Sequence, residues 1–368
     1  MIFDASASFI LTKICFCLKC IYDMPKLLLP ENYKPILNVK ETERAIVNIK
    51  EFFQLTLSTE LNLTRVTAPL FLEKGKGLND DLTGVETPVH FSVPDMNNIT
   101  LEIIHSLAKW KRVKLASMNV PPGFGIYTDM NAIRTHEELD NIHSLYVDQW
   151  DWEAVMKAEE RNLQFLERIV KKIYYCLKRT EFYLYDIYSE LKPRLPEHIT
   201  FIHSQDLLDR YPDLSPKMRE NKIAEECGAV FIIGIGAALS NGEPHDGRAP
   251  DYDDWTTECA PKRYGLNGDL LVWNPLLNQA LELSSMGIRV TPEVMRKQLT
   301  IRNAEEKAKL YFHSKLLNNE LPQTIGGGIG QSRMCMYFLR KAHIGEVQVS
   351  TWQDDIIQKC REHNIAIL

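Results

Sequence analysis

The segment PQTIGGGIGQSRM, which runs from Pro322 to Met334, carries glycine at four of the five positions 326–330 and leads through Arg333 into an apolar run. Glycine has no Cβ, so its backbone can approach a neighbouring group closely. Arg333 adds a permanent positive charge that can pair with a phosphate. The segment has neither the Gly-Lys-Ser/Thr of a P-loop nor the glycine spacing of a dinucleotide-binding turn. Taken alone, it fits a glycine-rich turn between a strand and a helix as well as it fits a nucleotide-binding site.

The composition is that of a globular protein, with 45% hydrophobic and 25% charged residues among 368. No linker rich in proline or glycine divides the chain after residue 24, so we expect one domain over 24–368. The net charge of −6 disfavours a protein that mainly grips a nucleic acid backbone. The eight cysteines lack zinc-ligand spacing, and those beyond residue 20 are scattered, which is typical of a reducing compartment such as the cytoplasm.

Residues 1–23 are moderately apolar, but Lys13 and Lys19 interrupt them and the run is too short to span a bilayer. They lack the basic start and the cleavage site of a signal peptide. We expect a disordered extension without function, or a start codon assigned too far upstream, and no membrane partner.

A helix is expected over residues 42–60, where apolar side chains recur at spacings of three and four. A β-prone segment over 64–72 follows, and Pro69 inside it indicates an edge or an interface, because proline cannot donate to a sheet. A second long helical region is expected over 153–191. The apolar stripe of the first helix is Ile46, Ile49, Phe53 and Leu57.

Residues 125–134 and 143–153 are expected to form an antiparallel pair of strands. Arg134 ends the first strand, and Asp148 and Asp151 lie on the second. Charges that project inward from a sheet are costly unless they are paired or bind a ligand, although both aspartates would also fit the solvent side. Further strands are expected at 199–203, 229–235, 267–275 and 281–290.

Three polar segments fit either solvated surface or a binding site. Residues 101–112 would place Lys109 and Arg112 on one face of a helix, as an exposed basic turn or an anion-binding segment. Asp80 and its neighbour lie in a loop with turn chemistry. The loop over 245–255 interleaves aspartates with aromatic residues, which suggests a partly covered site.

Three arginines far apart in sequence lie beside small residues or carboxylates, namely Arg134, Arg289 and Arg333. Such a set suits a ligand that carries several negative groups, for example a nucleoside triphosphate together with an acidic substrate.

Six segments, in this order, resemble the ammonia-dependent asparagine synthetase family, which is itself related to class II aminoacyl-tRNA synthetase cores. The segments are HSLAKWKR, LYVDQWDWE, RAPDYDDW, LNGDLLVWNP, ELSSMGIR and PQTIGGGIGQSR, and the resemblance spans residues 40–368. It implies an α+β fold, with a mostly antiparallel sheet flanked by helices and no doubly wound parallel sheet. It also implies a homodimer formed through the first helix and the segment around Pro69.

The resemblance further implies an ATP-dependent ligase that amidates L-aspartate with ammonia through β-aspartyl-adenylate, releasing AMP and pyrophosphate. Catalytic roles fall to Arg134, which would bridge the attacking carboxylate and the α-phosphate, and to Asp80, with Asp253 second, as the group that deprotonates ammonium. The implied aspartate contacts are Ser106, Gln149 and Asp151 at the ammonium group, and Lys111 and Arg289 at the α-carboxylate. The implied ATP contacts are Arg134, Glu282, Gly328, Gly330 and Arg333, and Mg²⁺ would be placed by Asp269 and Glu282. One departure is His136, which stands where the family pattern usually has a carboxylate near the adenine.

Two other functions are possible alternatives to the ligase activity. An aspartyl- or asparaginyl-tRNA synthetase would carry an oligonucleotide-binding barrel, and only about forty residues precede the first helix, too few for that barrel. A non-catalytic relative could use the fold as a binding platform, but Arg134 and Arg333 are both present. Free ammonia is the expected nitrogen source, because glutamine use needs a nucleophilic thiol in a separate domain, and residue 2 is Ile2.

Overall fold

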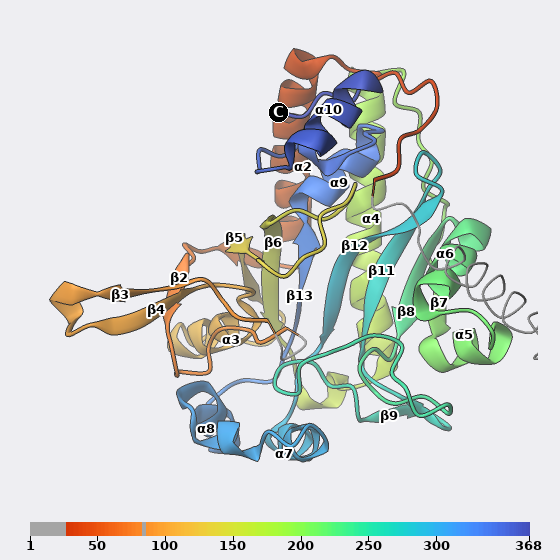
Figure 1. The fold of residues 1–368 in the computed structure, drawn as a ribbon. Coiled ribbons are helices and arrows are strands. Elements are labelled where there is room, and N and C mark those ends of the chain that lie inside the picture. Colours follow the sequence, from red (N-terminus) through yellow and green to blue (C-terminus); the bar gives the residue numbers. More distant parts are fainter. Residues whose placement is uncertain (1–26, 83–85) are drawn as a thin grey trace, which may run out of the picture.

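A mixed sheet of eight strands forms the centre of the molecule (Figure 1). The structure, a computed structural model, describes residues 27–82 and 86–368, so the expected extension over 1–23 lies outside the described residues. The strand order is β1-β5-β6-β13-β12-β11-β8-β7. The inner pairings are antiparallel, whereas the outer pairs β1–β5 and β7–β8 are parallel. The α+β prediction is therefore confirmed.

The strands of this sheet, in chain order, are β1 Leu63–Arg65, β5 Gly125–Ile133, β6 Tyr146–Val155, β7 Thr200–His203, β8 Ala229–Ile233, β11 Asn267–Asn274, β12 Gln279–Ile288 and β13 Thr324–Gly330. The helices are α2 Val39–Glu60, α3 Ala108–Ser117, α4 Leu163–Ile187, α5 Ser204–Arg210, α6 Pro216–Cys227, α7 Pro292–Ile301, α8 Tyr311–Leu317, α9 Gln331–Phe338 and α10 Asp354–Glu362. A small sheet holds β2 Phe71–Glu73, β3 His90–Val93 and β4 Ile99–Ile103, and a hairpin pairs β9 Glu258–Ala260 with β10 Arg263–Tyr264. Within the described residues, no helix is both long enough and apolar enough to cross a bilayer.

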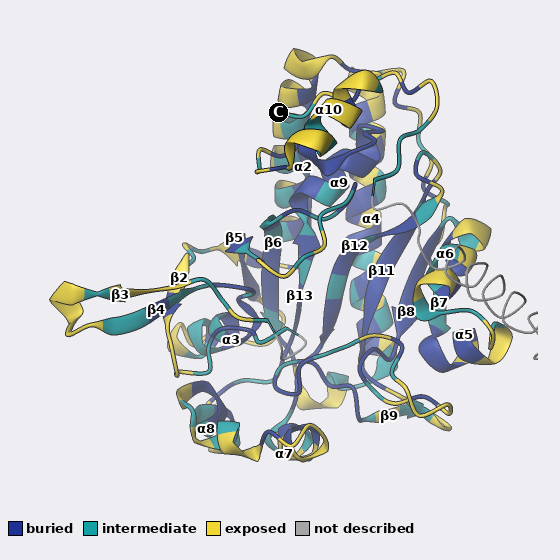
Figure 2. Cartoon of the chain, in the orientation of Figure 1, coloured by how far each residue is buried: buried dark blue, intermediate teal, exposed yellow. Residues whose placement is uncertain are grey.

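Helices α2 and α4 pack against one face of the sheet and bury their apolar stripes there (Figures 1 and 2). The ring of Phe53 on α2 lies 4.7 Å, centroid to centroid, from the ring of Trp150 on β6. Helix α2 begins earlier than predicted because Asn38 and Glu41 form a capping box at its start. Helix α4 is shorter than the predicted region, since the chain remains extended to the end of β6.

The segment over 64–72 is not the single strand that we predicted. Strand β1 lies at the edge of the large sheet, while β2 belongs to the small sheet with β3 and β4. Pro69 lies between them, and its missing N–H suits the change of sheet. The basic segment over 101–112 likewise divides, because its first residues complete β4 and α3 begins only at Ala108.

The glycines of β13 make room for side chains from both neighbouring strands. A Cβ on Gly326 would overlap the Glu153 carboxylate, and one on Gly328 would overlap the Gln149 amide. A Cβ on Gly327 would lie 2.5 Å from both Met286 Cβ and the Ser285 carbonyl oxygen on β12. The glycine run is therefore a structural requirement of close strand packing, whatever ligand it also faces.

We expect the Gly327→Ala substitution to lower the free energy of unfolding by about 2 kcal/mol, because the added methyl overpacks the β12–β13 contact. Gly330→Ala is the matched control. Its Cβ would meet nothing closer than 3.5 Å, at Arg333 Cβ, so a loss below about 1 kcal/mol is expected at this helix-capping position. Urea unfolding of both variants measures the difference, and equal losses would show that tight packing does not require Gly327.

Candidate active site

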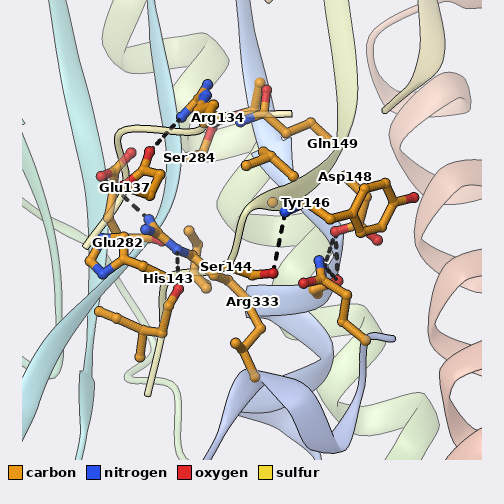
Figure 3. A pocket seen from close by; sticks show the side chains of 18 residues that line it. Arg134, Glu137, His143, Ser144, Tyr146, Asp148, Gln149, Glu282, Ser284 and Arg333 are labelled. Atoms are coloured by element: carbon orange, nitrogen blue, oxygen red, sulfur yellow. Dashed lines mark hydrogen bonds and ion pairs between the residues drawn. The ribbon is translucent and has the colours of Figure 1, made fainter. Parts of the chain in front are cut away.

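Two adjoining cavities open over β6, β12 and β13. The Asp80 cavity has a volume of about 380 Å³ and is lined by Asp80, Ser106, Gln149, Asp151, Arg248, Tyr252, Asp253 and Arg289, among others. The Arg333 cavity has a volume of about 200 Å³ and is lined by Arg333, Gly330, His143, Ser144 and Ser284, among others (Figure 3). Both are lined by Arg134, Glu137, Gln149, Glu282 and Gly328. The structure thus brings the predicted site residues together, except Lys111 and Asp269, which line neither cavity.

Strand β6 supplies the central side chains, because alternate residues of a strand point to opposite faces. Gln149 and Asp151 face the Asp80 cavity, while Trp150 between them is fully buried in the core. Asp148 is 6% exposed and accepts a hydrogen bond of 3.0 Å from the Ser332 N–H at the start of α9. Asp151 is 3% exposed. The alternative that both aspartates face solvent is therefore wrong.

Seven charged side chains form a row of alternating sign beside and beneath the Asp80 cavity. In order they are Asp269, Arg248, Asp253, Arg289, Glu153, Lys111 and Asp151. Arg248 Nη2 lies 2.7 Å from Asp269 Oδ1, and Arg248 Nε lies 3.6 Å from Asp253 Oδ2. Asp253 also pairs with Arg289 Nη1. A buried charge needs a partner of opposite sign. The five interior members of the row each have such a neighbour on both sides, and the two end members, Asp269 and Asp151, each have one.

Arg289 is the middle of this charge row and makes a bidentate pair with Glu153. Its Nε donates to Oε1 at 3.0 Å and its Nη2 donates to Oε2 at 2.8 Å. Burial alone would raise the pKa of Glu153, but Arg289 and Lys111 outweigh it and hold that pKa below its ordinary value. Two parallel hydrogen bonds fix the guanidinium plane, so Arg289 is held in one orientation at the cavity wall.

Lys111 lies behind the cavity wall and is fully buried. Its Nζ contacts Asp151, donates to the Trp152 carbonyl at 2.8 Å and lies 3.8 Å from Glu153 Oε2. The other oxygen of Asp151 accepts from the Leu107 N–H at 3.1 Å. Lys111 therefore does not line the Asp80 cavity itself, whereas its partner Asp151 does.

The basic face of α3 is buried and not the exposed basic turn that the sequence allowed. Lys109 Nζ lies 2.8 Å from Asp251 Oδ2, and His313 Nε2 lies 2.9 Å from the same oxygen. Burial would raise the pKa of Asp251, but Lys109 and His313 outweigh it and hold that pKa well below its ordinary range. Arg112 donates at 2.8 Å to each of the Pro322 and Val290 carbonyls.

Asp80 is held at the cavity by its own loop and by Ser106. Ser106 Oγ donates to Asp80 Oδ2 at 2.9 Å, and the Leu82 N–H donates to Oδ1 at 3.0 Å. The next residue, Asp81, pairs with Lys307. These contacts place the Asp80 carboxylate beside Ser106, one of the predicted aspartate contacts.

Arg134 and Arg333 both line the Arg333 cavity (Figure 3), and Arg134 also lines the Asp80 cavity. Arg134 follows β5, and its Nη1 lies 3.6 Å from Glu137 Oε1. Arg333 is in the first turn of α9; its Nη1 donates to the Glu282 carbonyl at 3.1 Å and lies 3.5 Å from Glu282 Oε2. A nucleotide in the Arg333 cavity would therefore meet two guanidinium groups.

Sequence reasoning did not assign roles to three groups at the site, namely Arg248, Tyr252 and Glu153. The first two belong to the aspartate-rich loop, whose aromatic residues indicated a covered site, and Glu153 could have been found because it lies two residues from Asp151 on the same face of β6. Asp269 pairs with Arg248 but lines neither cavity itself. In the part of the chain that the structure describes, no group of three or more histidine, cysteine or acidic side chains could hold a metal ion.

Solved structures of asparaginyl-tRNA synthetases have a similar fold. The Entamoeba histolytica enzyme, in complex with asparaginyl-adenylate, matches with a TM-score of 0.62 and 13% identity over 84% of this chain and 66% of that chain. The Pyrococcus horikoshii enzyme matches with a TM-score of 0.63 and 13% identity over 84% of this chain and 68% of that chain. At this identity the likeness identifies the fold alone, which is that of a class II synthetase core.

Curated relatives are far more similar in sequence. A Bacteroides thetaiotaomicron protein named aspartate–ammonia ligase is 56% identical over 345 residues, which are 94% of this chain and 100% of that protein. Proteins of the same name from Parabacteroides distasonis and Clostridium perfringens are each 57% identical with the same coverage. The family model described as aspartate-ammonia ligase matches residues 40–364. The chain therefore belongs to the aspartate–ammonia ligase family.

Proposed function

We propose that this protein is an aspartate–ammonia ligase that makes L-asparagine from L-aspartate, ammonia and ATP, with AMP and pyrophosphate as the other products. The observation that carries the proposal is the identity of 56–57% to aspartate–ammonia ligases over their whole length. The site supports it, because one wall offers carboxylates for an ammonium group and two arginines flank the space for a nucleotide.

In the first step, a β-carboxylate oxygen of aspartate bonds to the α-phosphorus of ATP, and the bond from that phosphorus to pyrophosphate breaks. Arg134 lines both cavities, which supports a role in bridging the carboxylate and the α-phosphate. In the second step, ammonia bonds to the β-carbonyl carbon and the bond to the AMP oxygen breaks. Starting from ammonium, one proton leaves before the attack and one after it, and we assign the first transfer to Asp80, with Asp253 second.

Aspartate is held, in this proposal, by Ser106, Gln149 and Asp151 at its ammonium group and by Arg289 at its α-carboxylate. All four line the Asp80 cavity. Lys111 acts through Asp151, because it is buried behind that carboxylate and does not line the cavity. ATP is held by Arg134, Glu282 and Arg333 over the backbone of Gly328 and Gly330.

Mg²⁺ is held in proteins by one or two carboxylates together with substrate phosphates. Glu282 fits this use, since its side chain is 41% exposed and lines both cavities. Asp269 fits less well, because it accepts a hydrogen bond from Arg248. The ion would neutralise phosphate charge when bound.

Three further inferences concern the whole protein. Residues 24–368 form one catalytic domain, a proposal supported by the family match over 40–364. The protein works in the cytoplasm, which the unpaired thiols of the described cysteines support. It forms a homodimer through α2 and the segment around Pro69. Both parts expose apolar side chains, namely Val47, Leu55, Leu70 and Phe71, and sedimentation equilibrium tests the assembly directly.

The activity itself is tested with aspartate, ATP and Mg²⁺, without tRNA, and with either ammonium or glutamine. We expect asparagine and AMP in equal amounts with ammonium, and little asparagine with glutamine. Formation of AMP without asparagine would contradict the proposed amidation. Formation of ADP in place of AMP would contradict the proposed adenylate intermediate.

The Arg333→Ala protein should fold normally but bind ATP about 10- to 100-fold more weakly, because a charge-assisted hydrogen bond to a phosphate contributes about 1.5–3 kcal/mol. Titration calorimetry with ATP and Mg²⁺ measures the change. Arg333→Lys keeps the charge but not the planar fork, so an intermediate affinity is expected. Unchanged ATP affinity in the alanine variant would remove Arg333 from the nucleotide site.

The Asp80→Asn substitution should slow asparagine formation by about 100-fold or more, because an amide cannot accept the proton from ammonium. Aspartate-dependent exchange of pyrophosphate into ATP, which needs no ammonia, should continue. Asp81→Asn is the matched control, since Asp81 pairs with Lys307 outside both cavities. An undiminished amidation rate in the Asp80 variant would contradict the assignment.

A further inference from the structure

The first turn of α9 carries Arg333, and its N-cap residue has no side chain that could cap the helix. Strand β13 runs directly into α9, and the residue at the N-cap is Gly330. A side-chain oxygen at the N-cap ordinarily accepts a hydrogen bond from one of the first backbone N–H groups of a helix. Glycine cannot provide that oxygen, so the acceptor has to come from elsewhere.

Asp148 on β6 supplies the acceptor. Its Oδ1 accepts from the Ser332 N–H at 3.0 Å and from the Ser332 hydroxyl at 2.6 Å. Ser332 is the second residue of α9, and the N–H groups of the second and third helical residues are those that a capping oxygen normally meets. The helix dipole further stabilises a carboxylate at this end of a helix. Strand β6 thus caps a helix that it does not precede in the chain.

A cation from α2 balances the charge of Asp148. Lys50 Nζ lies 3.1 Å from the other oxygen, Oδ2, and the Asp148 side chain is only 7% exposed. Burial would lower the pKa of Lys50, but Asp148 outweighs it and holds that pKa above its ordinary value. Both oxygens of the carboxylate therefore have partners within the protein, one on α9 and one on α2.

A second carboxylate holds the residue before Ser332 in the same turn. Gln331 Nε2 donates to Oδ1 of Asp129 on β5 at 3.0 Å. Ser332 follows, held by Asp148, and the next residue is Arg333. The segment that leads into the arginine is therefore held on two neighbouring strands, β5 and β6.

We propose that Asp148 is a positioning residue for ATP binding, which caps α9 so that the Arg333 guanidinium lies in the Arg333 cavity (Figure 3). The inference rests on the proposed function, because it takes ATP as the ligand of that cavity. Asp148 also lines the cavity, so two roles predict effects of opposite sign. A carboxylate that only lined the wall would repel the phosphates of ATP, and its removal would strengthen binding. Removal of a carboxylate that positions Arg333 weakens binding.

The Asp148→Ala variant of the full chain tests the proposal by titration calorimetry with ATP and Mg²⁺. We expect ATP to bind about 5- to 10-fold more weakly, as for the loss of a helix cap. In the Arg333→Ala background, the same substitution should weaken ATP binding less than about twofold, because the group that Asp148 positions is gone. Asp148→Asn keeps an oxygen for the Ser332 N–H but lacks the charge, so an affinity between those of the wild type and the alanine variant is expected.

Glu181→Ala is the matched structural control. The Glu181 carboxylate is also buried and accepts from a backbone N–H, that of Arg194, at 2.6 Å, but it lines neither cavity. This variant should lose stability in urea and keep its ATP affinity. An unchanged or higher ATP affinity in the Asp148→Ala protein would overturn the proposal, and so would equal weakening with and without Arg333.

If Asp148→Ala does not fold, Asp148→Asn decides the matter in the same two backgrounds. A weakening of about threefold that disappears without Arg333 supports the positioning role, and an affinity at or above that of the wild type refutes it. Failure of the proposed function would appear differently, as a wild-type protein that neither binds ATP nor makes asparagine.

Discussion

The alternating row of charges from Asp269 to Asp151 is the constraint on which the rest of the site depends. Ionised groups that leave water need partners close by, and the low-dielectric interior makes an unpaired one very costly. The row satisfies this requirement with pairs contributed by β6, β11, α3, the aspartate-rich loop and Arg289, the residue that follows β12. Members at the cavity wall, such as Arg289, are held by members behind it, such as Glu153. Contacts within the protein therefore hold the Arg289 guanidinium at the cavity wall without help from a ligand.

The fold accommodates this row through the backbone of β13. Gly326 lies opposite Glu153 in the strand register, and only a residue without a Cβ leaves space for the Glu153 carboxylate. The glycine run that first indicated either a turn or a nucleotide site thus has a third role. It makes space for the Glu153 side chain, which positions Arg289 just after the end of β12.

Local patterns in the sequence predicted the helices and strands well. A helix or strand that buries one face has apolar residues at a regular spacing, and a short segment is enough to show that spacing. The helix around Phe53 and the paired strands ending at Arg134 are examples. The resemblance to a known family gave the site residues, and all but Lys111 and Asp269 line the two cavities. Patterns failed where the deciding partner is distant in sequence. The sequence leaves Lys109 open between an exposed helix face and an anion-binding segment, because its partner, Asp251, lies 142 residues away. The segment around Pro69 changes sheet for reasons set by its neighbours in space.

The charge row also restricts how this sequence can diverge. Replacing one interior member by a neutral residue takes one oppositely charged partner from each of its two neighbours, so the loss at one position exceeds that of the side chain itself. A second substitution at the adjoining member would restore part of the balance. Changes at Glu153 and Arg289 should therefore be strongly epistatic and accumulate in pairs, whereas the exposed residues of α2 can drift one at a time.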